Sequence, residues 1–148
     1  MPSTHLSLHY HVVFSTKNRE PYIADPLVEL LHSYLGGLVR DLGGVPECIG
    51  GVADHVHMLL GLKATHRLCD VLREIKSSSS KWMHEVQEIK EFGWQDGYGA
   101  FTVSDNRREI VATYIRNQKV HHERKTFQEE YVNFLREAGV EYDERYLW

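Results

Sequence analysis

The segment VPECIGGVADHVHMLLGL, residues 45–62, predicts the centre of the fold as two short strands joined by a tight turn at Gly50-Gly51. Side chains two residues apart in a strand point to the same face of a sheet. One face of the second strand is apolar and suits a layer of helices; it consists of Val52, Val56, Met58, Leu60 and Leu62. The opposite face carries Ala53, His55 and His57. Two adjacent imidazoles on a face that the crossover helices leave open indicate a metal site, with surface or hydrogen-bonded histidines as the alternative.

Apolar residues recur at helical spacing in four other segments, each beginning after a capping or turn residue. These segments are 27–39 after Asp25-Pro26, 68–86 after Thr65, 108–120 after Asp105, and 127–139, which Thr126 and Glu129 open with a capping box. The apolar stripe of 68–86 keeps its phase across the four serines at 77–80, so one long helix is expected there.

Two more strands complete the pattern, because LSLHYHVVFST (6–16) and YGAFTVS (98–104) are rich in β-branched and aromatic residues. The order β-α-β-β-α-β, followed by two helices, predicts an α+β fold of the ferredoxin-like type (split βαβ, RRM-like). It is an antiparallel sheet with two helices on one face, to which 108–120 and a C-terminal helix are added. The length of 148 residues predicts one domain, 1–148.

The composition is that of a soluble globular protein, with 42% hydrophobic and 26% charged residues. The sequence shows no membrane span and no signal-peptide pattern. Cys48 and Cys69 lack C-x-x-C spacing and predict free thiols in a reducing cytoplasm. A net charge of -4 is unusual for a protein that coats duplex DNA, but it allows a local basic groove.

Tyr114 and Gln118 form a second pair of interest, because residues four apart share one face of a helix. Taken alone, the pair has two interpretations. It is either part of a site or, in the alternative, Tyr114 is a core aromatic beside Val111 and Ile115.

The motif DHVHMLL (54–60) followed by TYIRNQ (113–118) resembles the single-tyrosine HUH transposases, the insertion-sequence transposases and their REP-associated tyrosine transposase relatives. The resemblance covers nearly the whole chain. VVFSTKNREPYI (12–23) is similar to the family's first strand and the loop after it, GYGAFTVS (97–104) to the strand before its catalytic helix, and EYDERYLW (141–148) to a common family ending.

This resemblance implies a metal-dependent transposase that acts on single-stranded DNA beside hairpins or palindromes. His55, His57 and Gln118 would bind one divalent ion, Mg²⁺ or Mn²⁺, although two imidazoles as ligands favour Mn²⁺, Co²⁺ or Zn²⁺ over Mg²⁺. Tyr114 would attack a scissile phosphate, giving a 5′-phosphotyrosine and a free 3′-OH, so that strands are cleaved and rejoined without ATP. The family also implies a homodimer, in which the helix of one subunit can complete the site of the other. It further implies that the protein acts in the cytoplasm on nucleoid DNA and belongs to a mobile element.

Other polar residues are candidates for contacts with DNA, although a solvated surface charge is the alternative for each of them. These residues are Arg73, Lys76, Ser77 and Lys81 on one side of 68–86, and Lys17 and Arg19 after the first strand. His11 and His121 are candidates near the site. His9 and His11 also form a same-face pair, for which a second metal site, stacking on DNA and ordinary packing are all open.

Three other functions remain as alternatives. A domesticated relative would bind and cut repeated palindromes without being mobile. A phosphoesterase would use water instead of Tyr114 as the nucleophile. A non-catalytic RRM-like module would bind RNA, since GYGAFTV partly resembles an RRM strand, but it leaves the histidines and TYIRNQ without a role.

Overall fold

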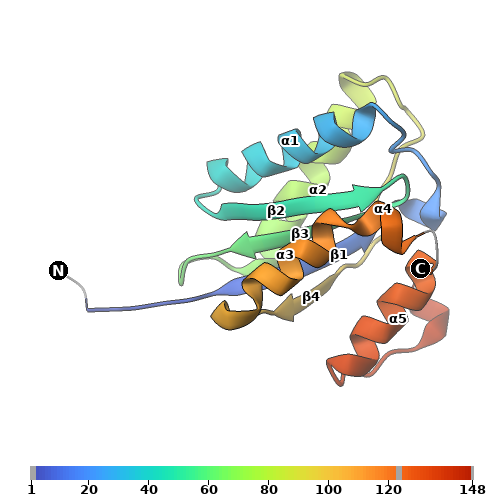
Figure 1. The fold of residues 1–148 in the computed structure, drawn as a ribbon. Coiled ribbons are helices and arrows are strands. Elements are labelled where there is room, and N and C mark those ends of the chain that lie inside the picture. The colour runs from blue at the N-terminus through green and yellow to red at the C-terminus, as the bar shows by residue number, and fades with distance from the viewer. Residues whose placement is uncertain (1–2, 123–124, 148) are drawn as a thin grey trace.

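The sheet has four antiparallel strands in the order β2-β3-β1-β4 (Figure 1). We describe residues 3–122 and 125–147 of a computed structural model, so Trp148 of the motif EYDERYLW lies outside the described residues. The strands are β1 (His9–Ser15), β2 (Val45–Val52), β3 (His55–Gly61) and β4 (Gly99–Thr102). This order confirms the predicted α+β, ferredoxin-like plan, in which β3 lies between β1 and β2.

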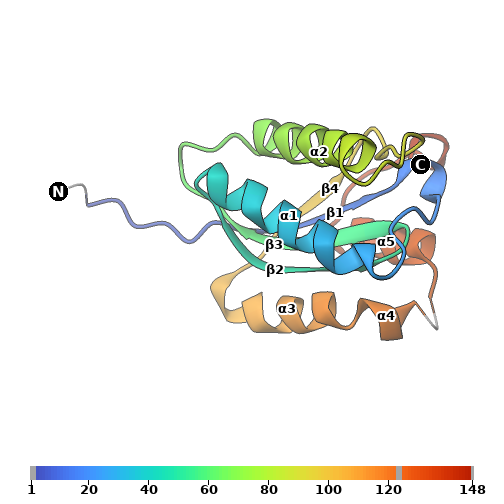
Figure 2. The ribbon, with the colours of Figure 1, turned by 90° about the horizontal axis from the view of Figure 1, so that it is seen from above.

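Helices cover both faces of the sheet (Figure 2). On one face lie α1 (Leu27–Asp41) and α2 (Leu68–Glu85), and on the other lie α3 (Arg108–Arg116), α4 (Gln118–His121) and α5 (Phe127–Glu137). Short 3-10 turns are η1 (Lys17–Arg19), η2 (Asp105–Arg107) and η3 (Glu144–Tyr146). No helix among the residues described is long and apolar enough to cross a bilayer.

The alternation of side chains along the strands divides the core into two layers. Val56, Met58 and Leu60 of β3 pack under α1 and α2, in a cluster that includes Leu35 and Leu72. The residues between them face α3 and α5, where smaller apolar clusters form. These smaller clusters contain Val13, Phe127, Tyr131 and Leu135, and Leu59, Val103, Ala112 and Ile115. The predicted apolar face is confirmed for Val56, Met58, Leu60 and, just after the strand, Leu62, whereas Val52 belongs to β2. The other face of β3 is covered as well.

The long helix across the serine tract is confirmed as α2. A buried serine is tolerated there because its hydroxyl both donates and accepts a hydrogen bond. Ser79 Oγ donates to the carbonyl of Ile75 at 2.6 Å and accepts from Trp94 Nε1 at 2.9 Å. The hydroxyl thus joins α2 to the loop before β4.

Several predicted boundaries were wrong. Pro26 and Arg67, not Asp25 and Thr65, precede the first turns of α1 and α2, and Asp105 begins η2. The segment 108–120 is two helices, because the backbone leaves helical geometry at Asn117. The capping box of α5 is confirmed, with Glu129 N donating to Thr126 Oγ1 and Thr126 N donating to Glu129 Oε2, each at 3.2 Å.

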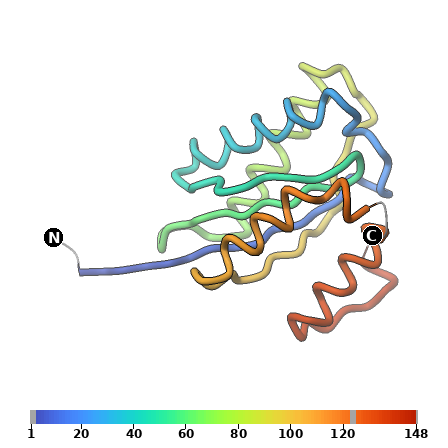
Figure 3. The backbone as a smooth tube through the Cα atoms, in the orientation of Figure 1, coloured from blue at the N-terminus to red at the C-terminus, as the bar shows by residue number. Residues whose placement is uncertain are grey.

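The predicted turn at Gly50-Gly51 was also wrong, because both glycines lie within β2 and the chain turns at residues 53–54. Gly50 instead marks a close approach of α3 to the sheet. A Cβ at this position would lie 2.2 Å from the carbonyl oxygen of Ile115. Figure 3 shows the trace of α3 running along β2 and β3 at this point.

We expect Gly50→Ala to lower the free energy of unfolding by about 2 kcal/mol, since an added methyl group forces α3 away from β2. Gly37→Ala is the control, because nothing lies within 4 Å of a Cβ there and alanine favours a helix. Urea unfolding of the two variants measures the difference. Equal stability of both variants and the wild type would contradict the close approach.

Candidate functional site

The two histidines of β3 lie beneath helices rather than on an open face. His55 and His57 both have 0% of their surface exposed. The open site expected from the sequence was therefore wrong, because α3, α4 and α5 pack over the sheet face that these side chains occupy.

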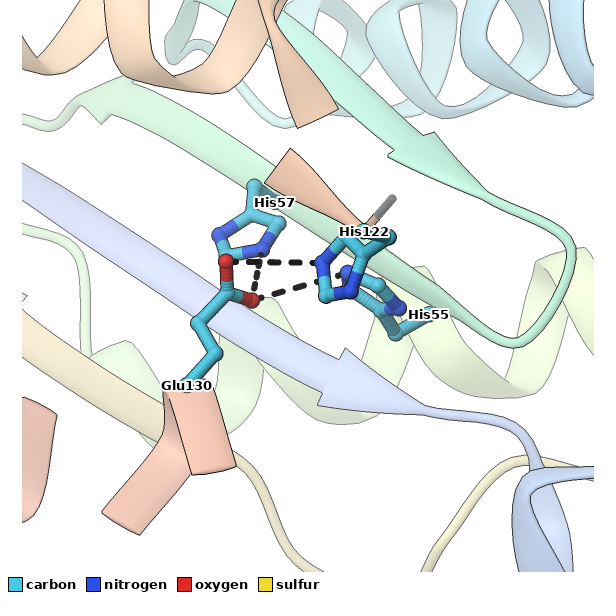
Figure 4. Close-up of side chains that lie close together, drawn as sticks. All are labelled: His55, His57, His122 and Glu130. Atoms are coloured by element: carbon cyan, nitrogen blue, oxygen red, sulfur yellow. Dashed lines mark hydrogen bonds and ion pairs between the residues drawn. The ribbon is translucent and has the colours of Figure 1, made fainter. Parts of the chain in front are cut away.

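Four side chains converge at this place, from β3, the end of α4 and the first turn of α5 (Figure 4). His55, His57, His122 and Glu130 each offer one ligand atom, and these atoms lie within 4.8 Å of one another. Glu130 Oε1 is 2.8 Å from His57 Nε2 and 3.6 Å from His55 Nε2, while Glu130 Oε2 is 3.4 Å from His122 Nε2. We call this group the histidine cluster.

The hydrogen bonds around His55 suit a cation. Asp54 Oδ1 lies 2.7 Å from His55 Nδ1, so it holds the proton on that nitrogen and leaves a lone pair on Nε2. Gln118 Oε1 faces this Nε2 at 3.1 Å, and the Gln118 amide nitrogen donates to the Tyr114 carbonyl at 3.3 Å. In the neutral tautomer of His55, two acceptors therefore face each other, and a cation bound by both would satisfy them. The residues present fit a divalent metal.

Tyr114 lies beside the cluster of its own chain. Its hydroxyl donates a hydrogen bond to Glu130, whose other oxygen contacts His57. The Tyr114 ring also lies 5.8 Å from the ring of His57 and 4.4 Å from that of His121. Burial and the hydrogen bond to the Glu130 carboxylate raise the pKa of the Tyr114 phenol above its ordinary value. In this arrangement the phenol is held neutral.

Glu130 is the charged centre of the site. Burial opposes its ionisation, but hydrogen bonds from His122 and His57 outweigh that effect and hold the pKa of its carboxyl well below the usual range. Burial lowers the pKa of His57 to about 4, although Glu130 works in the other direction. Burial also lowers the pKa of His11, to about 3, and His11 Nε2 lies 2.8 Å from His57 Nδ1. Burial opposes protonation of His122, but its hydrogen bond with Glu130 outweighs burial and raises the pKa of His122. The neutral His57 imidazole and the ionised Glu130 carboxylate are in the protonation states that a metal requires, whereas His122 would have to lose a proton more readily than it does beside Glu130 alone.

A cavity of about 260 Å³ between α3 and α5 reaches this centre from one side. Its lining includes His11, Tyr114, Glu130 and Phe134, with Arg107 and Lys125 as cationic members. The lining also includes Glu137, so two cationic side chains face two carboxylates, and Tyr114 is reached from a cavity of mixed charge. The Phe127 ring lies 4.5 Å from the His55 ring, measured between centroids, and covers the other side of the site.

The predicted DNA-contacting residues lie elsewhere. Arg73, Lys76 and Ser77 line a second cavity of about 400 Å³ between α2 and the loop before β4, on the other side of the sheet from Tyr114. Lys76 Nζ already donates to the carbonyls of Gln95 and Gly97, at 2.6 Å and 2.9 Å. Lys81 is exposed on the same helix, and Lys17 and Arg19 lie in η1.

The site contains two residues that the sequence did not single out for it, His122 and Glu130. His122 lies four positions after Gln118 and donates toward its Oε1 at 3.0 Å, so helical spacing was an available signal. Glu130 interrupts the apolar face of α5 that carries Phe127, Tyr131 and Leu135. A carboxylate on a buried apolar face is rare without a partner, so its position in the sequence was an available signal for a site. Of the two near-site candidates, His11 contacts His57, whereas His121 contacts the Tyr114 ring but is not a member of the cluster.

Comparisons with known proteins agree with this architecture. The model of the family "Transposase IS200 like" matches residues 4–118. The chain is 26% identical over 117 residues to the ISDra2 transposase TnpA of Deinococcus radiodurans, which spans 75% of this chain and 84% of the relative. The family match ends at Gln118, so His122 and Glu130 lie beyond it.

Solved structures share the fold. A candidate transposase from Deinococcus radiodurans R1 superposes with a TM-score of 0.67 at 26% identity, covering 80% of this chain and 95% of that one. A REP-associated tyrosine transposase bound to a REP hairpin superposes with a TM-score of 0.61 at 15% identity, covering 82% of this chain and 73% of that one. Since the family model spans most of the chain, the protein belongs to the IS200-like transposase family.

Proposed function

We propose that this protein cleaves and rejoins single-stranded DNA beside hairpins or palindromes, using Tyr114 as the nucleophile and a divalent metal at the histidine cluster. One observation carries the proposal. The Tyr114 hydroxyl and the cluster are joined within one chain through the Glu130 carboxylate. A nucleophile and a candidate metal site in direct contact are what phosphoryl transfer to a protein side chain requires.

The reaction follows from the position of the phenol. Tyr114 Oη would form a bond to the scissile phosphorus while the bond from phosphorus to the 3′ oxygen breaks. The phenol would lose one proton and the leaving 3′ oxygen would take up one proton, so the step consumes no proton overall. The 5′-phosphotyrosine conserves the phosphodiester, so a 3′-OH can reverse the step and join strands. His55, His57 and Gln118 would hold the divalent cation, with His122 and Glu130 as further donors. The bound cation would supply positive charge to offset the Glu130 carboxylate and to polarise the phosphate.

The proposal is tested with single-stranded hairpins from the flanks of the gene, incubated with the protein and Mg²⁺ or Mn²⁺. The expected product is a protein–DNA adduct that survives a denaturing gel. Cleavage without any adduct would favour the phosphoesterase, in which water attacks, and binding without cleavage would favour a binding-only relative.

Glu130 is expected to contribute to metal binding, because it is the only anionic donor of the histidine cluster. Glu130→Gln should weaken Mn²⁺ binding about 100-fold in a calorimetric titration without DNA. Glu129→Gln is the matched control, since it makes the same change at the next residue and a glutamine still completes the capping box. Unchanged Mn²⁺ affinity in Glu130→Gln would remove Glu130 from the ligand set.

We also propose that the basic residues of α2 hold the hairpin stem, since α2 lies across the sheet from the helix that carries Tyr114 and cannot reach the scissile phosphate. A double substitution, Arg73→Gln with Lys81→Gln, should weaken hairpin binding and reduce its logarithmic salt dependence by about 2. Lys63→Gln, which removes a charge after β3, should leave the salt dependence unchanged. A salt dependence that the double substitution does not alter would contradict these contacts.

Holding two cleaved 5′ ends at the same time needs two tyrosines, and each chain has one Tyr114 in contact with its own cluster. We therefore propose that two copies act together on cytoplasmic, nucleoid DNA as a homodimer, in which each site is complete within its chain. A mixture of a Tyr114→Phe chain and a His57→Ala chain then restores no adduct. Restored adduct formation in this mixture would show that sites are shared between subunits.

A further inference from the structure

Strand β2 contacts the helix that carries Tyr114 at three successive points. The Arg108 guanidinium donates to the Glu47 carboxylate, Cys48 Sγ lies 3.6 Å from the carbonyl oxygen of Ala112, and Gly50 meets the backbone of Ile115. The three α3 positions are separated by four and three residues, so they lie along one face of the helix. This face docks on β2, and we call it the docking face of α3.

A β-bulge allows Glu47 to take part. In the ladder between β2 and β3, Pro46 pairs with Leu60 and Cys48 pairs with Leu59, so that Glu47 has no partner residue on β3. In a regular strand, neighbouring side chains point to opposite faces, but a bulge redirects one of them. Because of the bulge, both Glu47 and Cys48 reach α3.

Glu47 is sheltered and bound from two sides. Its Oε2 lies 3.1 Å from His9 Nδ1 on β1, its other oxygen accepts from Arg108, and its side chain is 13% exposed. Arg108 also donates to Asp105 at 2.9 Å, at the start of η2. The other ion pair of α3, Arg116 with Glu109, is longer at 3.5 Å and 55% and 86% exposed. The Arg108 side chain is 39% exposed, so the Arg108–Glu47 pair is more sheltered than the Arg116–Glu109 pair, and exposed ion pairs are weak.

The docking face fixes the direction of the nucleophile. Tyr114 precedes Ile115, so it leaves the helix about 100° away from the docking face, toward the histidine cluster. Arg108 lies six residues earlier, about 9 Å along the helix axis. A helix of nine residues has little stability of its own, so its rotation about its axis depends on contacts with the sheet.

We propose that Glu47 is a positioning residue for the reaction, which acts through Arg108 to set the rotation of α3 and thereby the place of Tyr114. The inference rests on the proposed function, since it concerns the same nucleophile. Glu47 touches neither the histidine cluster nor the cavity at Tyr114, so its role is separate from metal binding and from proton transfer. The same contact explains why His9 and His11, on one face of β1, have different partners: His9 supports Glu47, and His11 supports His57.

The test compares Glu47→Gln and Arg108→Gln with their double variant, in the full chain. The matched controls are Glu109→Gln and Arg116→Gln, which make the same changes in the exposed pair of the same helix. The rate of adduct formation is measured at saturating hairpin DNA with Mn²⁺, together with hairpin affinity and hydrogen exchange of the α3 amides. We expect Glu47→Gln to lower the rate about 10-fold to 100-fold, with unchanged hairpin affinity and faster exchange in α3.

The double variant should be no slower than the slower single variant, because both changes break one contact. Arg108→Lys, which keeps the charge, should recover part of the rate. Three outcomes would overturn the inference: a wild-type rate in folded Glu47→Gln, an equal loss in Glu109→Gln, or losses that multiply in the double variant. If the wild type forms no adduct, the proposed function fails, and hydrogen exchange decides separately whether Glu47 sets the docking of α3.

Discussion

Replacing Tyr114 by phenylalanine is expected to lower covalent adduct formation at least about 10³-fold, because it removes the oxygen that attacks the phosphate. The ring contacts of Tyr114 with His57, His121 and Phe134 remain possible for phenylalanine, so the fold should persist. The measurement is the single-turnover rate on a hairpin substrate with Mn²⁺, followed on a denaturing gel.

Tyr34→Phe serves as the matched control, because Tyr34 lies in α1, across the sheet from the site. Its ring stacks on the ring of Trp82 in α2, with the ring centroids 4.7 Å apart. The Tyr114→Phe variant should bind Mn²⁺ and hairpin DNA as the wild type does. Strand cleavage that continues at the wild-type rate in Tyr114→Phe would contradict a tyrosine nucleophile and would favour attack by water.

Replacing His57 by alanine is expected to weaken Mn²⁺ binding at least about 100-fold and to abolish the adduct at ordinary metal concentrations. His57 contacts Glu130 through Nε2 and His11 through Nδ1, so its loss removes a ligand and the link to the supporting imidazole. Calorimetric titration of Mn²⁺ in the absence of DNA separates metal binding from catalysis.

His5→Ala is the control for this change, because His5 is an exposed histidine before β1. The two substitutions should have different effects on adduct formation and on Mn²⁺ binding. Tyr114→Phe should abolish the adduct without weakening Mn²⁺ binding, whereas His57→Ala should abolish the adduct and weaken Mn²⁺ binding. Wild-type Mn²⁺ affinity in His57→Ala would exclude the histidine cluster as the metal site.

The fold could be predicted largely because local patterns agreed with the global arrangement. Alternation in residues 54–60 assigned the faces of β3, and Thr126 with Glu129 marked the start of α5. The turn between β2 and β3 was misplaced for a physical reason. Gly50 is a glycine because the backbone of Ile115 approaches it, and a close approach between distant segments leaves no local signal.

The candidate site could be predicted in part. His55, His57, Tyr114 and Gln118 each lie in a short motif with strand or helix spacing, and the structure brings all four together. The contribution of Glu130 depends on how α5 docks against the sheet, which the spacing of residues cannot supply. The same docking buries the histidines that the two-layer plan left open.

The central claim is tested most directly by peptide mapping of the protein–DNA adduct with mass spectrometry. The account predicts one modified peptide, in which a nucleotide 5′-phosphate is bonded to Tyr114. A nucleotide on another residue, or a free 5′-phosphate on the cleaved DNA with no modified peptide, would contradict it.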